Sequence, residues 1–501
     1  GLRIALYLWT LGGPFVFDDL TLLLKAERFA RGETARLDLF RFAPDDASWR
    51  ALIDRGTYPW WSPPNNRIDF FRPVAECLFY FDVCLFGRNA LGHRLVSLIW
   101  FAAALLVVYR LYRSAGARAN RAGVATLMFG LCQALTPPVT FVSNRSDLLV
   151  IVGVGIAGIA YWSAQRQSHA LNIAWAAGGF VFGLLSKEPA VVFAAVLVVH
   201  QLWARKARID PSPSRQSRSI TTLIVAVGVA YLGYYVMSRS LTPSRQGPPL
   251  AVAIDLASKI GLYLSVWVMG LPIQALLGAG SGVVWFVSSA AFVLSFIVFI
   301  HLRRSEAIDS CCMFFAAWAM LFLVPAIIST AEPRALAIAS VGWCYLLAAL
   351  IVPAEKPAPI WLRHWLLFAN GGISVVAAVV TVRCTNDAEK QSRDSMREYL
   401  AQSSEPIANG QTLIVAEAKS PLEFLCAGDR LEYLTGCRDV SAIFLTPPDT
   451  AAKFDWQDDR TLIARSTGLT LLGQPMQRLT LGRHWDPGVK DQFILKEFTA
   501  E

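Results

Sequence analysis

The chain has 501 residues, of which 54% are hydrophobic and only 17% charged, with a formal net charge of +9. Long apolar runs with charges clustered between them are typical of a polytopic membrane protein, because a bilayer rather than water must solvate most of such a chain. The basic residues gather in short loops between these runs. This is the positive-inside pattern of an oriented membrane protein, so the positive charge does not indicate a nucleic-acid partner.

The first apolar run, residues 1–13, is interpreted as a retained first span that leads outward. A long mixed loop follows, from about residue 18 to 91, and loops of this length are usually functional. The next span, about 91–112, ends among arginines and is expected to reach the cytoplasm. Further spans are expected at about 122–135, 148–162, 171–185, 190–203, 220–237, 283–301, 312–329, 336–351 and 365–382.

These runs predict an α-helical polytopic protein of about eleven spans, at ~20 residues each, with its amino terminus inside and its carboxyl terminus outside. The segment 260–277 does not fit this alternation as a single crossing. Because it contains Gly270 and Pro272, we interpret it as a re-entrant segment or a broken pair of short helices, which is tolerated only inside protein or along a cavity.

From residue 384 onward the composition becomes that of a small soluble domain. A polar helix is expected at 387–402, followed by short strands at 412–416, 442–445, 461–464, 469–472 and 477–481. We therefore divide the chain into a membrane domain, 1–383, which includes the long first outer loop, and an extracytoplasmic α+β domain, 384–501. Cys426 and Cys437 are candidates for a small disulfide loop in this domain.

Two adjacent carboxylates, Asp18 and Asp19, directly follow the first apolar run. Stability does not call for a doubled charge at the end of a span, so the pair indicates a functional site. The alternative is a solvated span end or the start of a capped helix.

Charged and amide side chains recur wherever the chain is expected to return to the outer face. They are Asp18, Asp19, Arg72, Glu76, Asn144, Arg145, Asp147, Lys187, Glu188, Glu332 and Arg334. Any one of them is more readily explained as a turn, a snorkelling side chain or a surface pair. Five separate returns that all carry such residues indicate one common site.

These residue types suit the transfer of a sugar from a lipid phosphate. A carboxylate can take the proton of an attacking hydroxyl, and arginine or lysine can neutralise a phosphate leaving group. Neighbouring spans would hold the lipid tail. The aromatic residues Tyr58, Trp60 and Trp61 could stack on sugar rings, or equally form an interfacial aromatic belt. No spacing of ligands requires a metal ion, and no cofactor beyond the lipid-linked donor is indicated.

Five short motifs resemble those of the GT-C superfamily of polytopic glycosyltransferases, in its branch of O-mannosyltransferase-like and tetratricopeptide-containing transmembrane mannosyltransferases. Their order and spacing over about residues 1–352 carry the resemblance. They are Phe15-Val16-Phe17-Asp18-Asp19, Phe71-Arg72-Pro73, Ser143-Asn144-Arg145-Ser146-Asp147-Leu148-Leu149, Leu185-Ser186-Lys187-Glu188, and Ala331-Glu332-Pro333-Arg334 followed by Ser340-Val341-Gly342-Trp343-Cys344.

The resemblance implies an inverting glycosyltransferase that uses a polyprenyl-phosphate sugar outside the cytoplasm. The family's catalytic base lies at the start of the first outer loop, which corresponds to Asp18 or Asp19, with Asp18 slightly favoured. The phosphate-side candidates by position are Arg72, Arg145, Lys187 and Arg334. Supporting or acceptor-side candidates are Glu76, Asn144, Asp147, Glu188 and Glu332.

The sequence departs from the branch in two ways. The loop at 136–142 lacks the histidines of the tetratricopeptide mannosyltransferases, and no tetratricopeptide array follows the spans. The sugar is therefore mannose or another hexose or pentose, and the acceptor a protein, lipid or glycan. A transporter or flippase of a lipid-linked glycan and a membrane scaffold are alternatives. The expected location is a bacterial inner membrane.

Overall fold

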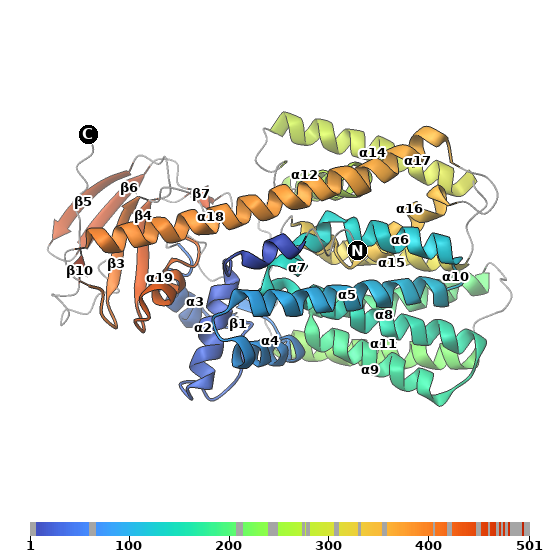
Figure 1. Ribbon diagram of the computed structural model, residues 1–501, viewed down its shortest axis with the longest axis horizontal. Helices are drawn as coiled ribbons and strands as arrows, with labels where there is room; N and C mark the ends of the chain where they lie inside the picture. The colour runs from blue at the N-terminus through green and yellow to red at the C-terminus, as the bar shows by residue number, and fades with distance from the viewer. Residues whose placement is uncertain are drawn as a thin grey trace. The chain divides into compact units, whose positions relative to one another are not determined.

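The computed structural model divides the chain into two compact units, each described here by itself (Figure 1). The membrane unit comprises Gly1–Gly13 and Phe71–Arg383, and the second unit comprises Pro14–Phe70 and Cys384–Glu501. The structure describes residues 7–59, 67–206, 214–238, 249–272, 276, 281–304, 310–328, 332–352, 358–403, 406–417, 423–446, 452–458, 461–466, 470–471, 474–475, 479–480 and 493–494.

This division differs from the one expected from the sequence. Most of the first outer loop, Pro14–Phe70, groups with the carboxyl-terminal residues and not with the spans. Composition changes at residue 384, but it does not reveal that a segment near the amino terminus packs with that domain. The second unit is therefore discontinuous in sequence, and we call it the composite unit.

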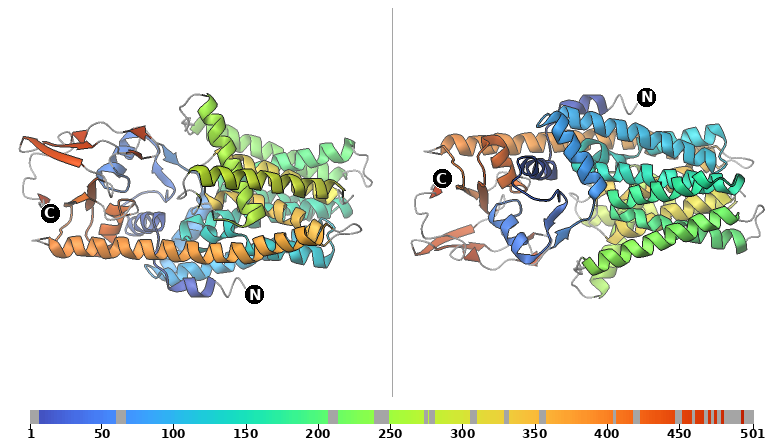
Figure 2. Two further views of the ribbon diagram at one scale, coloured as in Figure 1. Left: turned by 90° about the horizontal axis from the view of Figure 1, so that it is seen from above. Right: turned by 90° about the horizontal axis from the view of Figure 1, so that it is seen from below.

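The membrane unit is helical, and both turned views show its long helices running side by side (Figure 2). Its elements are η1 (Trp9–Gly12), α4 (Pro73–Phe86), α5 (Ala90–Ser114), α6 (Ala119–Leu131), η2 (Gln133–Leu135), α7 (Thr136–Thr140), η3 (Val142–Arg145), α8 (Ser146–Arg166), α9 (Ala170–Ser186), η4 (Glu188–Val191), α10 (Val192–Lys206), α11 (Arg215–Ser238), α12 (Pro249–Met269), α14 (Ser281–Arg304), α15 (Ser310–Ile328), η5 (Pro333–Leu336), α16 (Ala339–Ile351), α17 (Ile360–Leu367), η6 (Phe368–Ile373) and α18 (Ser374–Gln402), which continues into the composite unit.

Within the described residues, six helices are long and apolar enough to cross a membrane, or seven if the bent pair Ala119–Leu131 and Gln133–Thr140 is one span. The protein is thus a polytopic helical membrane protein. Eleven full-length spans are not found there. The expected spans at 171–185 and 336–351 correspond to helices of 17 and 13 residues, shorter than the ~20 residues that cross a ~30 Å core. Part of the expected first span lies outside the described residues.

The break predicted within segment 260–277 is found at Gly270, where helix α12 ends. Residues 273–275 and 277–280 lie outside the described residues. Helix α12 runs without a break from Pro249 to Met269, and Gly270, with φ of 70°, follows its end. Helix α12 begins at Pro249, before the first residue of the predicted segment. Proline is well tolerated in the first turn of a helix, where its missing N–H would have no partner.

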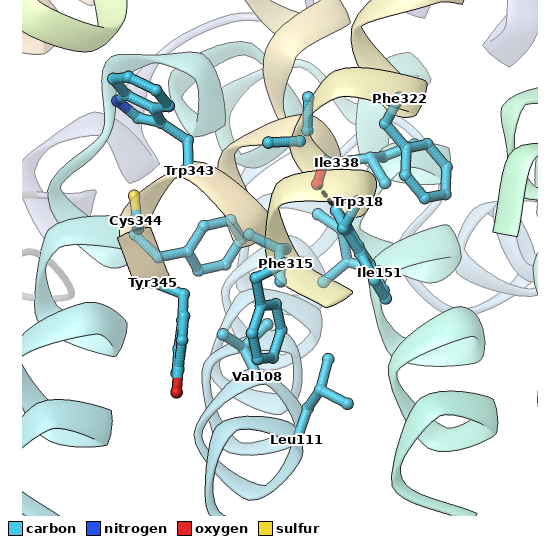
Figure 3. Close-up of a cluster of buried hydrophobic side chains, with 14 of the residues drawn as sticks. Val108, Leu111, Ile151, Phe315, Trp318, Phe322, Ile338, Trp343, Cys344 and Tyr345 are labelled. Carbon is cyan, nitrogen blue, oxygen red and sulfur yellow. Dashed lines mark hydrogen bonds between the residues drawn. The ribbon is translucent and has the colours of Figure 1, made fainter. Parts of the chain in front are cut away.

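Aromatic and aliphatic side chains pack together in a cluster of buried hydrophobic residues of the membrane unit (Figure 3). Trp318 and Tyr112 are fully buried, and each places its polar atom on a backbone carbonyl. The Trp318 indole donates to Ile338 O at 2.8 Å, and the Tyr112 hydroxyl donates to Val341 O at 2.6 Å. Buried polar groups without such partners would be costly in an apolar interior. These bonds fix α16 against α5 and α15.

Helices α8 and α9 form an antiparallel pair whose backbones approach closely. A Cβ atom on Gly153 would lie 2.6 Å from Gly179 O, and one on Gly179 would lie 2.7 Å from Gly153 O. Small residues that allow this approach are typical of helix packing in membranes. The pair brings the start of α8 and the end of α9 together.

The composite unit has an α+β fold. Its elements are α2 (Asp18–Ala30), β1 (Arg41–Ala43), α3 (Asp46–Asp54), β2 (Ile68–Asp69), the second part of α18, β3 (Thr412–Glu417), α19 (Ala427–Thr435), β4 (Ser441–Thr446), β5 (Ala452–Asp458), β6 (Thr461–Ser466), β7 (Thr470–Leu471), β8 (Gln474–Pro475), β9 (Leu479–Thr480) and β10 (Phe493–Ile494). Strands β3 and β4 pair in parallel, Thr412 opposite Ser441, and α19 supplies the crossover that a parallel pair needs. Strand β10 pairs with β3. The remaining sheets are antiparallel.

Cys426 and Cys437 are free thiols, so the disulfide considered for them is not formed. They flank α19, a helix of nine residues. A helix of that length separates its ends by roughly 14 Å, twice what a disulfide can bridge. Spacing in sequence did not reveal the helix between them.

Backbone hydrogen bonds join the first loop to the start of α19. The amides of Cys426, Ala427 and Gly428 donate to the carbonyls of Thr57 and Gly56, at 2.9, 3.0 and 3.3 Å. The first amides of a helix have no partner within the helix, and here the first loop supplies the acceptors. The contact is tight, since a Cβ atom on Gly428 would lie 1.9 Å from Arg55 O.

Replacing Gly56 by alanine should destabilise the composite unit. Gly56 has φ of +75°, and a Cβ atom there would lie 1.7 Å from Ala442 O. The Gly56→Ala protein should lose more than the ~1–2 kcal/mol that the left-handed backbone alone costs, measured by thermal unfolding and limited proteolysis in detergent.

Gly410→Ala is the matched control, because Gly410 has φ of +78° with nothing within 4 Å of a Cβ atom. Equal losses for the two variants would contradict the close backbone approach at Gly56.

Candidate functional site

The α8–α9 pair brings an acid and a base together at one end. Asp147 lies in the first turn of α8, where the helix dipole favours a negative charge, and Lys187 directly follows α9. The Lys187 ammonium donates to both Asp147 oxygens, at 2.7 and 2.8 Å. The Asp147 side chain is nearly fully buried. Two residues forty positions apart in the sequence thus form one ion pair.

A second ion pair lies next to the first in the chain. Arg72 precedes α4, whose first residue is Pro73, and Glu188 begins η4 immediately after Lys187. The Arg72 guanidinium donates through Nε to Glu188 Oε1 at 3.1 Å and through a terminal nitrogen to Oε2 at 2.9 Å. Two-pronged pairs of this kind hold both partners in a fixed geometry.

A third cation, Arg334, extends the group. It lies in η5, pairs with Glu332 just before that turn, and donates to the side-chain oxygen of Asn144 in η3. Both charged partners are partly exposed, with 30% and 40% of their side chains accessible. Arg334 therefore belongs to the rim of the group, whereas Asp147 is at its buried end.

The three cations lie close enough to influence one another electrostatically. Burial lowers the pKa of the Lys187 ammonium, Asp147 opposes this effect, and the positive charges of Arg72 and Arg334 lower the pKa further. We call Arg72, Asp147, Lys187, Glu188, Glu332 and Arg334 the ionic cluster. It contains three cations and three carboxylates in three pairs, so each cation is held in place by a carboxylate.

Arg145, also predicted to be on the phosphate side, has other partners. It forms an ion pair with Asp82 in α4 and donates to Ser97 Oγ at 3.0 Å and to His93 O at 2.7 Å. Arg145 and Asp82 are almost completely buried. The ion pair with Asp82 and the bonds to Ser97 and His93 hold η3 against α4 and α5. Arg145 therefore contributes to the packing of these helices.

Glu76 is buried in the first turn of α4, and its amide donates to Arg72 O at 2.9 Å. This bond begins the helix directly after Arg72 and fixes the backbone from which the Arg72 side chain extends.

Replacing Arg145 by glutamine should be strongly destabilising, because it leaves the Asp82 charge buried. Breaking one partner of a buried pair costs about 3–5 kcal/mol. The Arg145→Gln protein should show a lower melting temperature and less monodisperse protein in size-exclusion chromatography.

The Arg145→Gln/Asp82→Asn double variant should recover a large part of that loss. If the single variant folds as well as the unmodified protein, the pair does not stabilise the membrane unit.

The Asp18-Asp19 pair lies in the composite unit, at the start of α2. Phe17, directly before it, has φ of 47° and ψ of −117°, a backbone conformation that costs a residue with a side chain ~1–3 kcal/mol and is often found at functional sites. Phe15 and Val16 are buried and anchor the turn. The turn presents two carboxylates in a fixed arrangement.

The two aspartates differ in their surroundings. Asp19 is completely buried, and its carboxylate accepts a bond from the Val16 amide at 3.3 Å. Asp18 is half-buried. Its charge raises the pKa of the Cys426 thiol, which burial has already raised. Asp19 thus closes the turn, and Asp18 is the more accessible acid.

Of the three aromatic residues predicted to stack on sugar rings, the structure describes only Tyr58. Tyr58 lies against Trp49, with ring centroids 4.9 Å apart. Trp60 and Trp61 lie outside the described residues. In the part of the chain that the structure describes, no three His, Cys, Asp or Glu side chains are grouped so that they could hold a metal ion.

Sequence reasoning missed several charged residues of the composite unit. Glu389 and Arg430 are completely buried and form a two-pronged pair at 3.0 and 3.3 Å. Asp429 accepts bonds from Thr21 at 2.7 Å and Thr57 at 3.2 Å. The (i, i+4) spacing of Glu389 and Arg393 was one sequence signal that could have indicated an ion pair within this helix. In the membrane unit, Asp82 was also missed, although it lies within an apolar run and a buried charge requires a partner.

No protein-family model and no curated protein match the sequence. Among solved structures, the chain is similar to the oligosaccharyltransferase of Archaeoglobus fulgidus in the apo form, with 12% identity, a TM-score of 0.44, and coverage of 85% of this chain and 64% of that one. The chain thus spans slightly less than two thirds of that enzyme. It is also similar to ArnT from Cupriavidus metallidurans bound to undecaprenyl phosphate, with 13% identity, a TM-score of 0.45, and coverage of 86% and 84%. At such identities and TM-scores the likeness assigns neither family nor activity.

Proposed function

We propose that the protein is a membrane glycosyltransferase of the GT-C type that moves a sugar from a polyprenyl phosphate to an acceptor hydroxyl. The sugar is mannose or another hexose or pentose, and the acceptor is a protein, lipid or glycan. The reaction takes place on the outer face of a bacterial inner membrane, with the amino terminus in the cytoplasm.

The observation that supports this proposal best is the ionic cluster at the ends of apolar helices. Three cations, Arg72, Lys187 and Arg334, gather where α8 begins and α9 ends. Each of these cations pairs with a carboxylate, Asp147, Glu188 or Glu332, and guanidinium and ammonium groups have several hydrogen-bond donors each. A phosphate carried on a lipid would be held there by charge-assisted hydrogen bonds, with its chain beside the apolar helices.

In the proposed reaction the acceptor oxygen attacks the anomeric carbon of the sugar and inverts its configuration. The bond between that carbon and the phosphate oxygen breaks, and the electron pair leaves with the polyprenyl phosphate. Arg72, Lys187 and Arg334 stabilise the negative charge that develops on the phosphate. Asp18 takes the proton of the acceptor hydroxyl as general base.

The assignment of the base to Asp18 follows from the difference between the two aspartates. A general base must reach the hydroxyl that it deprotonates. Asp18 is half-buried, whereas Asp19 is fully buried and bonded to the Val16 amide. We therefore assign Asp19 a structural role in the turn.

Two of the similar solved structures contain a polyprenyl phosphate, the lipid carrier of the proposed donor, as their names state. One is ArnT bound to undecaprenyl phosphate, and another is the archaeal enzyme in complex with an inhibitory peptide and a dolichol-phosphate. The proposal rests on the side chains of the ionic cluster and on the sequence motifs.

Replacing Asp18 by asparagine should reduce sugar transfer by about 10²–10⁴-fold, because the amide cannot accept the proton. Asp19→Asn should have a smaller effect, since its side-chain oxygen can still accept from the Val16 amide. The measurement is the release of undecaprenyl phosphate from lipid-linked sugars in membranes containing each variant, followed by mass spectrometry.

Thermal unfolding of each variant separates chemistry from folding. If Asp18→Asn keeps full turnover and Asp19→Asn loses it, Asp19 is the base. If both keep full turnover, the general-base assignment is wrong.

Replacing Arg334 by glutamine should weaken the binding of undecaprenyl phosphate by about 10- to 100-fold, the equivalent of one charged hydrogen bond. Arg334 is the suitable cation to change because its partner Glu332 is 40% exposed, so no buried charge is left unpaired. Native mass spectrometry or ligand-induced thermal stabilisation measures the binding.

Arg113→Gln, an exposed arginine near the end of α5, is the control and should bind normally. Equal affinities of the Arg334→Gln and Arg113→Gln variants would exclude Arg334 from the phosphate site.

A further inference from the structure

Arg393 connects helix α18 to the turn that carries Asp18. Its guanidinium donates to Phe15 O at 2.8 Å through a terminal nitrogen and to Glu389 Oε1 at 2.9 Å through Nε. The same group lies over the Tyr433 ring, 5.0 Å from its centroid. Arg393 is thus fixed on three sides, and one of its contacts is the backbone three residues before Asp18.

We infer that Arg393 is a positioning residue for the proposed base, and that the carboxyl-terminal part of the chain is therefore needed to align Asp18. This inference rests on the proposed function. Phe17 is held in a costly backbone conformation, and such a conformation persists only when its surroundings enforce it. The bond from Arg393 to Phe15 O holds one side of the turn, and the Asp19–Val16 bond holds the other.

The positioning role of Arg393 can be tested separately from folding, because Glu389 has a second cationic partner. Glu389 is completely buried, but Arg430 pairs with both of its oxygens. Removing Arg393 therefore leaves Glu389 with a cation. The Arg393 side chain is itself 13% exposed. The expected effect of its loss is a looser turn in a unit that still folds.

The first test is hydrogen–deuterium exchange of the full-length protein in detergent. In the turn, the Asp19 amide bonds to Val16 O and the Leu20 amide to Phe17 O, both at 3.0 Å. The Arg393→Met variant should exchange peptides that cover residues 14–20 at least several-fold faster than the unmodified protein, with peptides of β3 and β4 unchanged. Arg393→Lys should restore much of the protection, because an ammonium can still reach a carbonyl.

Arg397→Met is the matched control, one turn further along α18, where Arg397 pairs with Asp394 and both side chains are more than half exposed. It should leave the exchange of residues 14–20 unchanged. If Arg393→Met also leaves it unchanged, or if β3 and β4 lose protection equally, the positioning role is overturned.

The second test is undecaprenyl phosphate release with the same variants. Arg393→Met should lower the maximal rate more than tenfold while the affinity for undecaprenyl phosphate stays the same, and Arg393→Lys should recover part of the rate. If the turn loosens but the transfer rate stays full, Arg393 holds the turn but the turn does not supply the base. That result would refute the assignment of Asp18 as general base in the proposed function. An unaltered turn refutes the positioning role alone.

Discussion

Charge removed from water must find a fixed partner, and this constraint governs both units of the protein. In the membrane unit, Asp147 has Lys187 and Asp82 has Arg145. In the composite unit, Glu389 has Arg430 and Arg393, and Asp429 has Arg55 at 3.0 Å. An unpaired charge in such a place would cost several kcal/mol. Each pair therefore determines which segments of the chain must meet.

The pairs divide into two kinds by what surrounds them. Arg145 and Asp82 are buried among helices that they hold together, with His93 and Ser97 as further partners. The ionic cluster instead runs from buried Asp147 to partly exposed Arg334 and Glu332. The proposed phosphate would approach from the accessible side, at Arg334. That difference separates structural arginines from those proposed to bind the donor.

The sequence was informative where a chemical pattern is local. Apolar runs predicted the helical membrane protein, and the motifs around Arg72, Lys187 and Arg334 included residues that the structure brings together. It was uninformative where contacts join distant segments. Nothing near Arg55 or Gly56 indicates that their carbonyls meet α19 and β4, because a backbone contact leaves almost no trace in side-chain composition. The discontinuous composite unit could not be predicted for that reason.

The bonds between Gly56, Thr57 and the start of α19 also determine the order in which the protein can be completed. Chains are synthesised from the amino terminus, and domains fold as units. Residues 14–70 emerge early, but their partners at 426–442 follow only after all the membrane helices have been made. The early segment must remain without its partner throughout insertion of the bundle. Contacts this distant in sequence form slowly, so closure of the composite unit is expected to be a late step in biogenesis, and the turn bearing Asp18 takes its final form only then.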